Sequence, residues 1–220
     1  MNGKKRISVV ASELCLLALA STVVSAAPTV IFERLPDPLP FFNGLSSYGS
    51  QRIADDFYLE NTAHVQYVHF WGFDAGTSYA DDFTFTFYDS TEISGDRLPD
   101  NELLTTAASV MAMPINEHGN EQYWAKLDTP FNAAGGVTYF LSIYNNGAGD
   151  AGGIWAWAWS SQVGSGAFRS ENPDGDWMPT TDAQAFQLVV PEPATAVLAA
   201  LGFGIALLIL RIRSGDRNNR

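Results

Sequence analysis

The sequence predicts an all-β protein: an antiparallel β-sandwich of jelly-roll type, flanked by an N-terminal signal peptide and one C-terminal transmembrane helix. Within residues 51–190, short runs alternate between apolar and polar side chains, which is the period of a strand with one buried face. Turn signals rich in Gly, Asn and Asp separate these runs, and no stretch between them has a helical period of useful length. Two longer apolar runs lie near the ends of the chain.

The first 26 residues have the three parts of a secretory signal peptide. Basic residues at positions 4–6 precede an apolar run over residues 7–24, which ends in small residues up to Ala26. We therefore expect export through the Sec translocon and cleavage by signal peptidase before Ala27. The cleavage removes Cys15, the one cysteine, so the mature protein has no disulfide. The alternative is an uncleaved N-terminal anchor.

Residues 27–50 are rich in Pro, Gly and Ser, which predicts an extended lead-in to the folded domain. The strands of the sandwich are expected after it, at 54–59, 64–73, 82–88, 103–113 (with a break), 122–127, 137–144, 154–160 and 183–189. Strict alternation places Val65, Tyr67, His69 and Trp71 on one face of the second of these strands.

The central part of the chain is strongly acidic. Residues 27–190 hold 21 acidic side chains against five basic ones, a net charge of −16. We therefore expect no nucleic-acid binding, because phosphate contacts need clustered Lys and Arg. The charge favours solubility, or the binding of cations such as calcium.

The C-terminal segment, residues 191–220, combines three features. These are, in order, the motif Pro191, Glu192 and Pro193, an apolar run over residues 194–210, and the basic residues Arg211 and Arg213. Seventeen helical residues rise about 26 Å, close to the ~30 Å hydrocarbon core of a bilayer. The positive-inside rule places both basic ends of the chain in the cytoplasm, so the domain between them lies outside the inner membrane.

This tail resembles the PEP-CTERM sorting signal of Gram-negative bacteria over roughly residues 190–213. The resemblance implies that an exosortase, a membrane-embedded thiol protease, removes the tail and releases the domain towards the cell surface or extracellular matrix. It also implies an association with exopolysaccharide and biofilm-matrix production. Strand motifs such as Asp-Asp-Phe-Thr-Phe at 81–85 are similar to ectodomains that precede such tails, which supports the fold alone. The alternative is a permanent tail anchor.

Trp155, Trp157 and Trp159 share one face of a predicted strand. They are candidates for a carbohydrate-binding platform, because sugar rings stack on aromatic faces. The favoured alternative is a stripe that faces the core, since tryptophan is highly buried on average. Trp159 lies near the strand end and is the best candidate for exposure.

Adjacent acidic residues indicate a second candidate site. Calcium takes six to eight oxygen ligands, often from neighbouring loops, and a jelly roll brings the loops at its strand ends together. A structural calcium site at Asp55, Asp56, Asp81 and Asp82 is therefore a hypothesis. The alternative is that these carboxylates are solvated at the surface.

Signatures of common enzyme classes are absent. The sequence has no Gly-x-Ser-x-Gly, His-Glu-x-x-His or phosphate-binding glycine motif, and its three histidines are too scattered to predict a metal site. We therefore expect no catalytic residues. The expected function is that of an exported surface or matrix protein with a structural or adhesive β-sandwich. The alternatives are a carbohydrate-binding module for exopolysaccharide and, less favoured, a polysaccharide hydrolase.

Overall fold

The computed structural model describes residues 28–38, 43–75, 80–116, 119–151, 153–170 and 175–191. The predicted signal peptide and the predicted transmembrane segment at 194–210 lie outside the described residues. The described residues from Pro28 to Pro191 belong to one compact unit.

The described part of the chain contains thirteen strands and one short helix. The strands are β1 (Thr29–Arg34), β2 (Gly44–Ser46), β3 (Gln51–Leu59), β4 (Ala63–Ala75), β5 (Phe83–Ile93), β6 (Asp96–Pro114), β7 (Asn120–Ala133), β8 (Val137–Asn145), β9 (Ile154–Ser160), β10 (Gly166–Ser170), β11 (Met178–Thr180), β12 (Ala183–Gln184) and β13 (Phe186–Val190). The prediction of an all-β fold is confirmed. The helix, α2 (Asn146–Ala151), has six residues, and no helix within the described ranges has the length and apolar character that a bilayer crossing requires.

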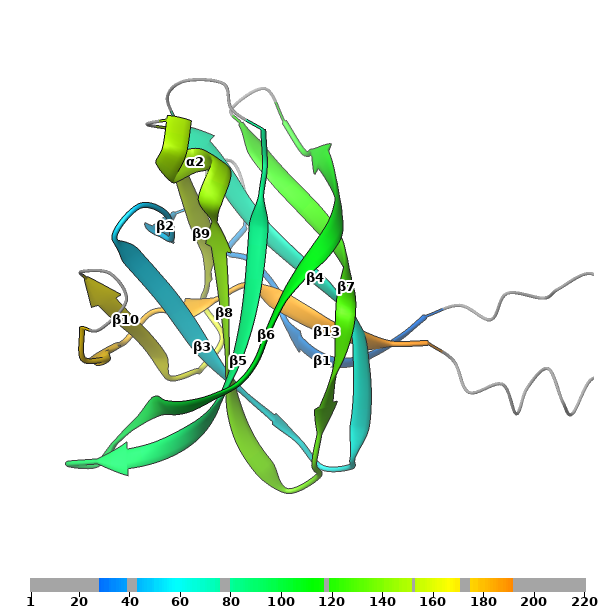
Figure 1. Cartoon of the computed structure of the whole chain (residues 1–220), viewed down its shortest axis with the longest axis vertical. Helices are drawn as coiled ribbons and strands as arrows, with labels where there is room; N and C mark the ends of the chain where they lie inside the picture. The colour runs from blue at the N-terminus through cyan, green and yellow to red at the C-terminus, as the bar shows by residue number, and fades with distance from the viewer. Residues whose placement is uncertain are drawn as a thin grey trace, which may run out of the picture. The chain divides into compact units, whose positions relative to one another are not determined.

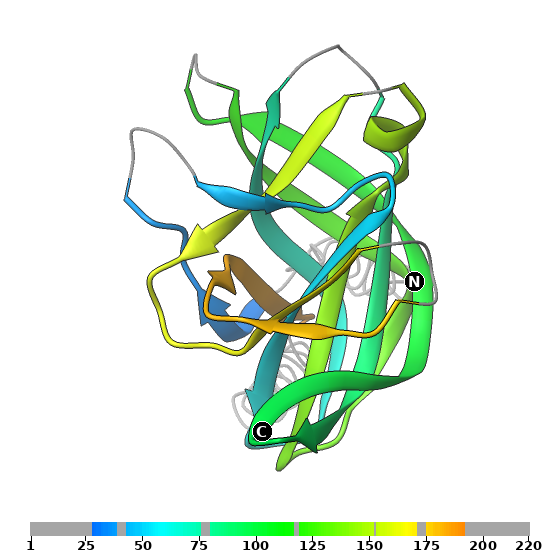
Figure 2. The same ribbon diagram turned by 90° about the vertical axis from the view of Figure 1, so that its left-hand side faces the viewer.

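The described strands pair antiparallel throughout, in the order β1-β13-β4-β7-β6-β5-β8-β3-β10-β11. β9 lies off this path and pairs with β4, β2 and β12. The 19-residue β6 pairs with β5 up to Ala107 and with β7 from Ala108 onward. The sheet therefore curls into a half-barrel around one core (Figures 1 and 2).

The core is dominated by aromatic rings from both halves of the curled sheet. Phe57 of β3 lies 6.2 Å from Phe87, 6.4 Å from Phe131 and 6.5 Å from Phe186, measured between ring centroids. Phe87 and Phe131 stack at 4.2 Å with an interplanar angle of 6°. These rings come from β3, β5, β7 and β13, so their burial holds together strands that do not all pair with one another.

Each predicted strand corresponds to one or more observed strands, and the bounds of β9 agree with the expected residues 154–160. The break expected within 103–113 corresponds to the change of partner in β6 at Ala108. The hairpin from β5 to β6 turns through Ser94 (φ 56°) and Gly95 (φ 92°), with Ile93 opposite Asp96. Two positive φ angles define the type I′ turn that two-residue hairpins favour.

The structure differs from the prediction in residues 27–50. They are not only a lead-in, because β1 pairs with β13 and β2 pairs with β9. The β-prone run Thr-Val-Ile-Phe forms β1, and the prolines that suggested an extended segment follow it. The short strands β10 and β11 were not predicted either.

One face assignment in β4 is also corrected. A bulge interrupts the pairing of β4 with β7 between Val65 and Tyr67, so strict alternation fails there. Val65 is fully buried in the main core, whereas His69 and Trp71, which are buried as well, lie on the opposite face of the sheet.

Candidate functional site

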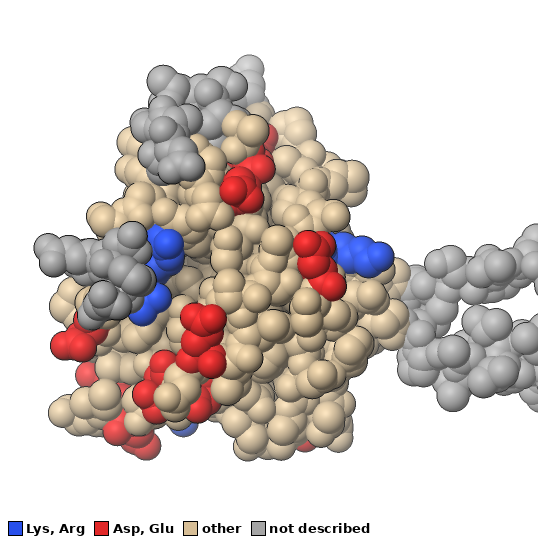
Figure 3. Space-filling view, in the orientation of Figure 1, with Lys and Arg blue, Asp and Glu red and all other residues tan. Residues whose placement is uncertain are grey.

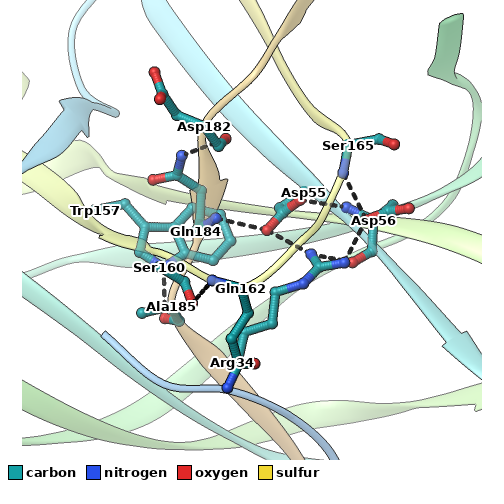
Figure 4. A network of polar contacts seen from close by, with 10 residues as sticks. All are labelled: Arg34, Asp55, Asp56, Trp157, Ser160, Gln162, Ser165, Asp182, Gln184 and Ala185. Carbon is teal, nitrogen blue, oxygen red and sulfur yellow. Dashed lines mark hydrogen bonds and ion pairs between the residues drawn. The ribbon is translucent and has the colours of Figure 1, made fainter. Parts of the chain in front are cut away.

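Arg34, at the end of β1, binds two adjacent carboxylates of β3 (Figure 4). Its Nη1 lies 2.7 Å from Oδ2 of Asp55, and its Nη2 lies 2.6 Å from Oδ1 of Asp56. Nη1 also donates to the main-chain oxygen of Asp56 at 2.8 Å. Asp55 has no exposed surface, Arg34 has 7% and Asp56 has 9%. The three charges therefore form a buried cluster, here called the Arg34 cluster.

Main-chain donors from distant segments complete the Arg34 cluster. The N–H of Gln184 in β12 donates to Asp55 Oδ2 at 2.6 Å, and that of Ser165 donates to Asp56 Oδ1 at 3.0 Å. A Cβ at Gly164 would lie 2.5 Å from Arg34 Cζ, so this glycine permits the chain to pack against the guanidinium. Burial raises the pKa of Asp55 to about 7, although the charge of Arg34 and the hydrogen bond from Gln184 lower it.

The arrangement of the Arg34 cluster is that of a structural clasp. It connects β1, β3 and β12 with the segment that leads into β10, at the place where β1 and β3 are neighbours without pairing. A fully buried carboxylate already bound by an arginine cannot reach a substrate. Loss of one member of the cluster would leave the remaining charges buried and uncompensated, which is strongly destabilising.

The two predicted aspartate pairs do not come together. Asp81 accepts a hydrogen bond from Nδ2 of Asn145 at 2.7 Å, and the N–H of Asp82 donates to Oδ1 of Asn145 at 3.2 Å. Asp55 lies opposite Leu141 of the same strand, β8. Leu141 and Asn145 are four residues apart, which corresponds to about 13 Å along a strand, so the two aspartate pairs lie at separate places on β8. Asp55 and Asp56 instead have a guanidinium as their counter-ion.

Asp81 has other acidic neighbours. Partial burial raises its pKa to about 6, and the negative charges of Asp74 and Glu121 add to the effect. Glu121 also accepts a hydrogen bond from the hydroxyl of Tyr123. Among the described residues, no three His, Cys, Asp or Glu side chains are grouped so as to hold a metal ion. Structural calcium stays a prediction.

The tryptophans of β9 occupy different environments. Trp155 and Trp157 have no exposed surface and belong to the main core. Nε1 of Trp157 donates to the main-chain oxygen of Ala185 at 2.9 Å (Figure 4). Ala158, on the other face of β9, is fully buried as well. Neither buried indole can stack on a sugar, and only Trp159 of the three retains partial exposure.

A different aromatic surface lies on the outer face of the sheet. Five residues occupy one row across neighbouring strands, here called the outer row: Glu33, Gln187, His69, Trp124 and Met111. The rings of His69 and Trp124 stack at 4.2 Å with an interplanar angle of 11°. Trp124 is half-buried, and Met111 beside it is 57% exposed.

Hydrogen bonds order the polar part of the outer row. Nε2 of Gln187 donates to Glu33, so the Oε1 of Gln187 faces Nδ1 of His69, which donates to it at 2.8 Å. Nε2 of His69 lies 3.2 Å from Oε1 of Gln122. Burial lowers the pKa of His69, although the hydrogen bonds with Gln187 and Gln122 raise it. The row thus combines stacked rings with fixed amide and carboxylate groups.

The sequence pattern indicates only part of the outer row. Alternation placed His69 and Trp71 on one face of β4, but Trp124 stood in no pattern. Its pairing with His69 depends on the register between β4 and β7, which also contains the bulge. Gln187 and Glu33 join the row through the pairing of β13 with β1, although the two residues are 154 positions apart in the sequence.

A surface pocket of about 680 Å³ lies beside the end of β13. Glu60 is the one carboxylate among the described residues that line it, so these residues do not supply the facing carboxylate pair of a glycosidase. The lining residues are Ile31, Tyr58, Leu59, Glu60, Asn61, Thr62, Ala63, His64, Val190 and Pro191.

No protein-family model matches the chain, and no curated protein is similar to it in sequence. Of the predicted sorting residues, Pro191 is exposed at the end of β13. Glu192, Pro193, Arg211 and Arg213 lie outside the described residues. The sorting function therefore remains a proposal from the sequence.

Proposed function

We propose that this protein is an exported surface or extracellular-matrix protein, sorted through a PEP-CTERM signal, with a non-catalytic structural or adhesive domain. The observation that carries this proposal is the order of features at the C-terminus. The Pro-Glu-Pro motif at 191–193, the apolar run at 194–210 and the arginines that follow come directly after the last strand. The expected partners are the Sec translocon, signal peptidase, exosortase and the inner membrane.

The ends of the domain support this proposal. Thr29 of β1 pairs with Val190 of β13, so the chain enters and leaves the domain at neighbouring points. The predicted signal-peptidase site before Ala27 and the sorting motif at 191–193 are each within a few residues of that pair. Cleavage at both sites would leave the strands and the core of the domain intact.

The described domain favours a structural or adhesive role. Its largest aromatic side chains and its most deeply buried charges are used in packing and in the Arg34 cluster. We further propose that the curled sheet is a sandwich of jelly-roll type. This is supported by β6, whose first part pairs with β5 and whose second part pairs with β7, so that it runs from one half of the sheet into the other. The domain would begin outside the inner membrane and end at the cell surface or in the matrix.

Replacement of the sorting motif tests the proposal. The variant Glu192→Ala/Pro193→Ala, expressed in the native host, should retain its tail and stay in the membrane fraction. The matched control Thr195→Ala changes the same tail outside the motif and should be processed like the wild type. Immunoblots of membrane and extracellular fractions distinguish the two. Normal processing of the double variant contradicts exosortase recognition.

A carbohydrate-binding module is the second candidate. The outer row supports it, because the half-buried ring of Trp124, stacked on the buried His69, lies next to the polar side chains of Gln187 and Glu33. Saccharides are bound by such combinations of ring faces and planar hydrogen-bonding groups. On this proposal the ligand is an exopolysaccharide, and the binding residues differ from the tryptophans of β9.

A further inference from the structure

Two arginines face each other on the outer face of the other half of the sheet. Arg52 of β3 lies directly opposite Arg169 of β10. Like charges directly opposite each other in a sheet are destabilising. Figure 3 shows basic side chains gathered on the left of the view, where β3 and β10 lie in Figure 1. Residues 27–190 hold only five basic residues, and two of them lie opposite each other here. The repulsion between these two charges needs a compensating interaction.

No described carboxylate supplies that compensation. Both ion pairs found among the described residues belong to Arg34. Nη1 of Arg52 donates to the main-chain oxygen of Gly49 at 3.4 Å, a long contact. Nη2 of Arg169 lies 3.4 Å from the hydroxyl of Tyr88, and its buried Nε has no hydrogen-bond partner within the described part of the chain. Within the described residues, the only further side-chain hydrogen bond of the pair is that of Arg52 with Tyr144, so neither guanidinium has a described carboxylate as its partner.

Aromatic rings frame the arginine pair. Cζ of Arg52 lies 3.0 Å from the ring centroid of Tyr144, and Cζ of Arg169 lies 4.6 Å from that of Trp177. The ring of Tyr88 meets that of Trp177 edge-on at 5.5 Å. Burial lowers the pKa of Arg52, and the charge of Arg169 adds to this effect. A bound anion would relieve both penalties, and the rings hold the guanidinium groups in place for it.

We propose that Arg52 and Arg169 bind the carboxylate of a uronic-acid unit in an acidic polysaccharide. A guanidinium matches a carboxylate in charge and planar geometry, and the partly exposed ring of Trp177 offers apolar surface to the sugar ring. The net charge of −16 on residues 27–190 repels dense polyanions, which favours carboxylates spaced along a largely neutral chain. This inference rests on the proposed location outside the cytoplasm, where such polymers occur.

Calorimetric titration of the full chain in detergent tests the proposal, with a neutral xylo-oligosaccharide that bears one glucuronic-acid unit as the acidic probe and the unsubstituted xylo-oligosaccharide of equal length as the comparison. Wild type should bind the acidic probe, and the neutral probe should bind at least about tenfold more weakly. Arg52→Gln and Arg169→Gln should each weaken binding of the acidic probe about tenfold, as expected for the loss of a charge-assisted hydrogen bond. Arg52→Lys keeps the charge and should retain part of the affinity.

Arg97→Gln is the matched control, because Arg97 is an exposed arginine whose Nη1 contacts Oγ1 of Thr138 at 3.3 Å. It should change the affinity by less than about twofold, and thermal melts establish that all variants are folded. Absence of uronate binding overturns the proposal, as does an equal loss in Arg97→Gln. Equally tight binding of inorganic sulfate would indicate a simple anion site, and self-association abolished by Arg52→Gln would assign the surface to a second copy. Either result also overturns it. Tail processing, which these substitutions do not touch, reports on the proposed function separately.

Discussion

Substitution of Arg34 by Met is expected to destabilise the domain strongly. It leaves Asp55 and Asp56 buried without a counter-charge, with exposed fractions of 0% and 9%. Removing one partner of a buried ion pair costs about 3–5 kcal/mol. The loss should be larger at pH 8 than at pH 5, because a protonated carboxyl tolerates burial without a counter-charge. For a domain of this size the cost corresponds to a melting temperature lower by roughly 6–20 °C.

Urea unfolding of the full chain, followed by tryptophan fluorescence, measures this loss. Adding Asp55→Asn and Asp56→Asn to the Arg34→Met variant should restore part of the stability, because the uncompensated charges are then removed. The control Arg97→Met alters an exposed arginine and should shift the free energy of unfolding by about 0.5 kcal/mol or less. A loss below about 1 kcal/mol for Arg34→Met, or no recovery in the triple variant, refutes the role assigned to the Arg34 cluster.

Two further predictions concern pH and sugar binding. Burial raises the pKa of Asp55 to about 7, so ionisation of this carboxyl is less favourable in the folded than in the unfolded protein. The contribution of Asp55 to the free energy of unfolding should therefore be full below about pH 4 and lost as the pH rises through 7. Asp55→Asn should remove this pH dependence in urea unfolding between about pH 4 and 8, and an unchanged slope contradicts the prediction. Trp124→Ala should weaken binding of a neutral oligosaccharide several-fold without a large change in stability. Trp157→Phe loses the hydrogen bond to Ala185, so it should destabilise the domain and leave the affinity for the neutral oligosaccharide unchanged. If Trp157→Phe weakens sugar binding and Trp124→Ala does not, the sugar site lies at β9 instead.

Local patterns predicted most of the strands because the signal for each is carried by neighbouring residues. Phe83, Phe85 and Phe87 alternate with threonines and are all buried in the core of the structure. Ser94 and Gly95 form the turn between β5 and β6, and glycine adopts the positive φ angle of its position without strain. β1 was missed because its stability comes from pairing with β13, which lies at the far end of the domain.

Faces were predicted less well than strands. A single bulge after Val65 reversed part of β4, and alternation has no means of signalling a bulge. In β9 both the tryptophan face and the alanine face are covered, so the pattern alone does not show which residues are exposed. The candidate sugar surface therefore moved from Trp155 and Trp157 to Trp124.

The amino-acid sequence alone determines the strongly acidic charge, the alternating strands and the order of features at the two ends, because these depend on residue type and on near neighbours. The Arg34 cluster and the arginine pair depend on contacts between distant segments. Asp55 meets the N–H of Gln184 across 129 positions, and Arg52 faces Arg169 only through the register of β3 with β10. Such contacts follow from how the sheet curls and pairs, which is a property of the whole chain rather than of any segment in it.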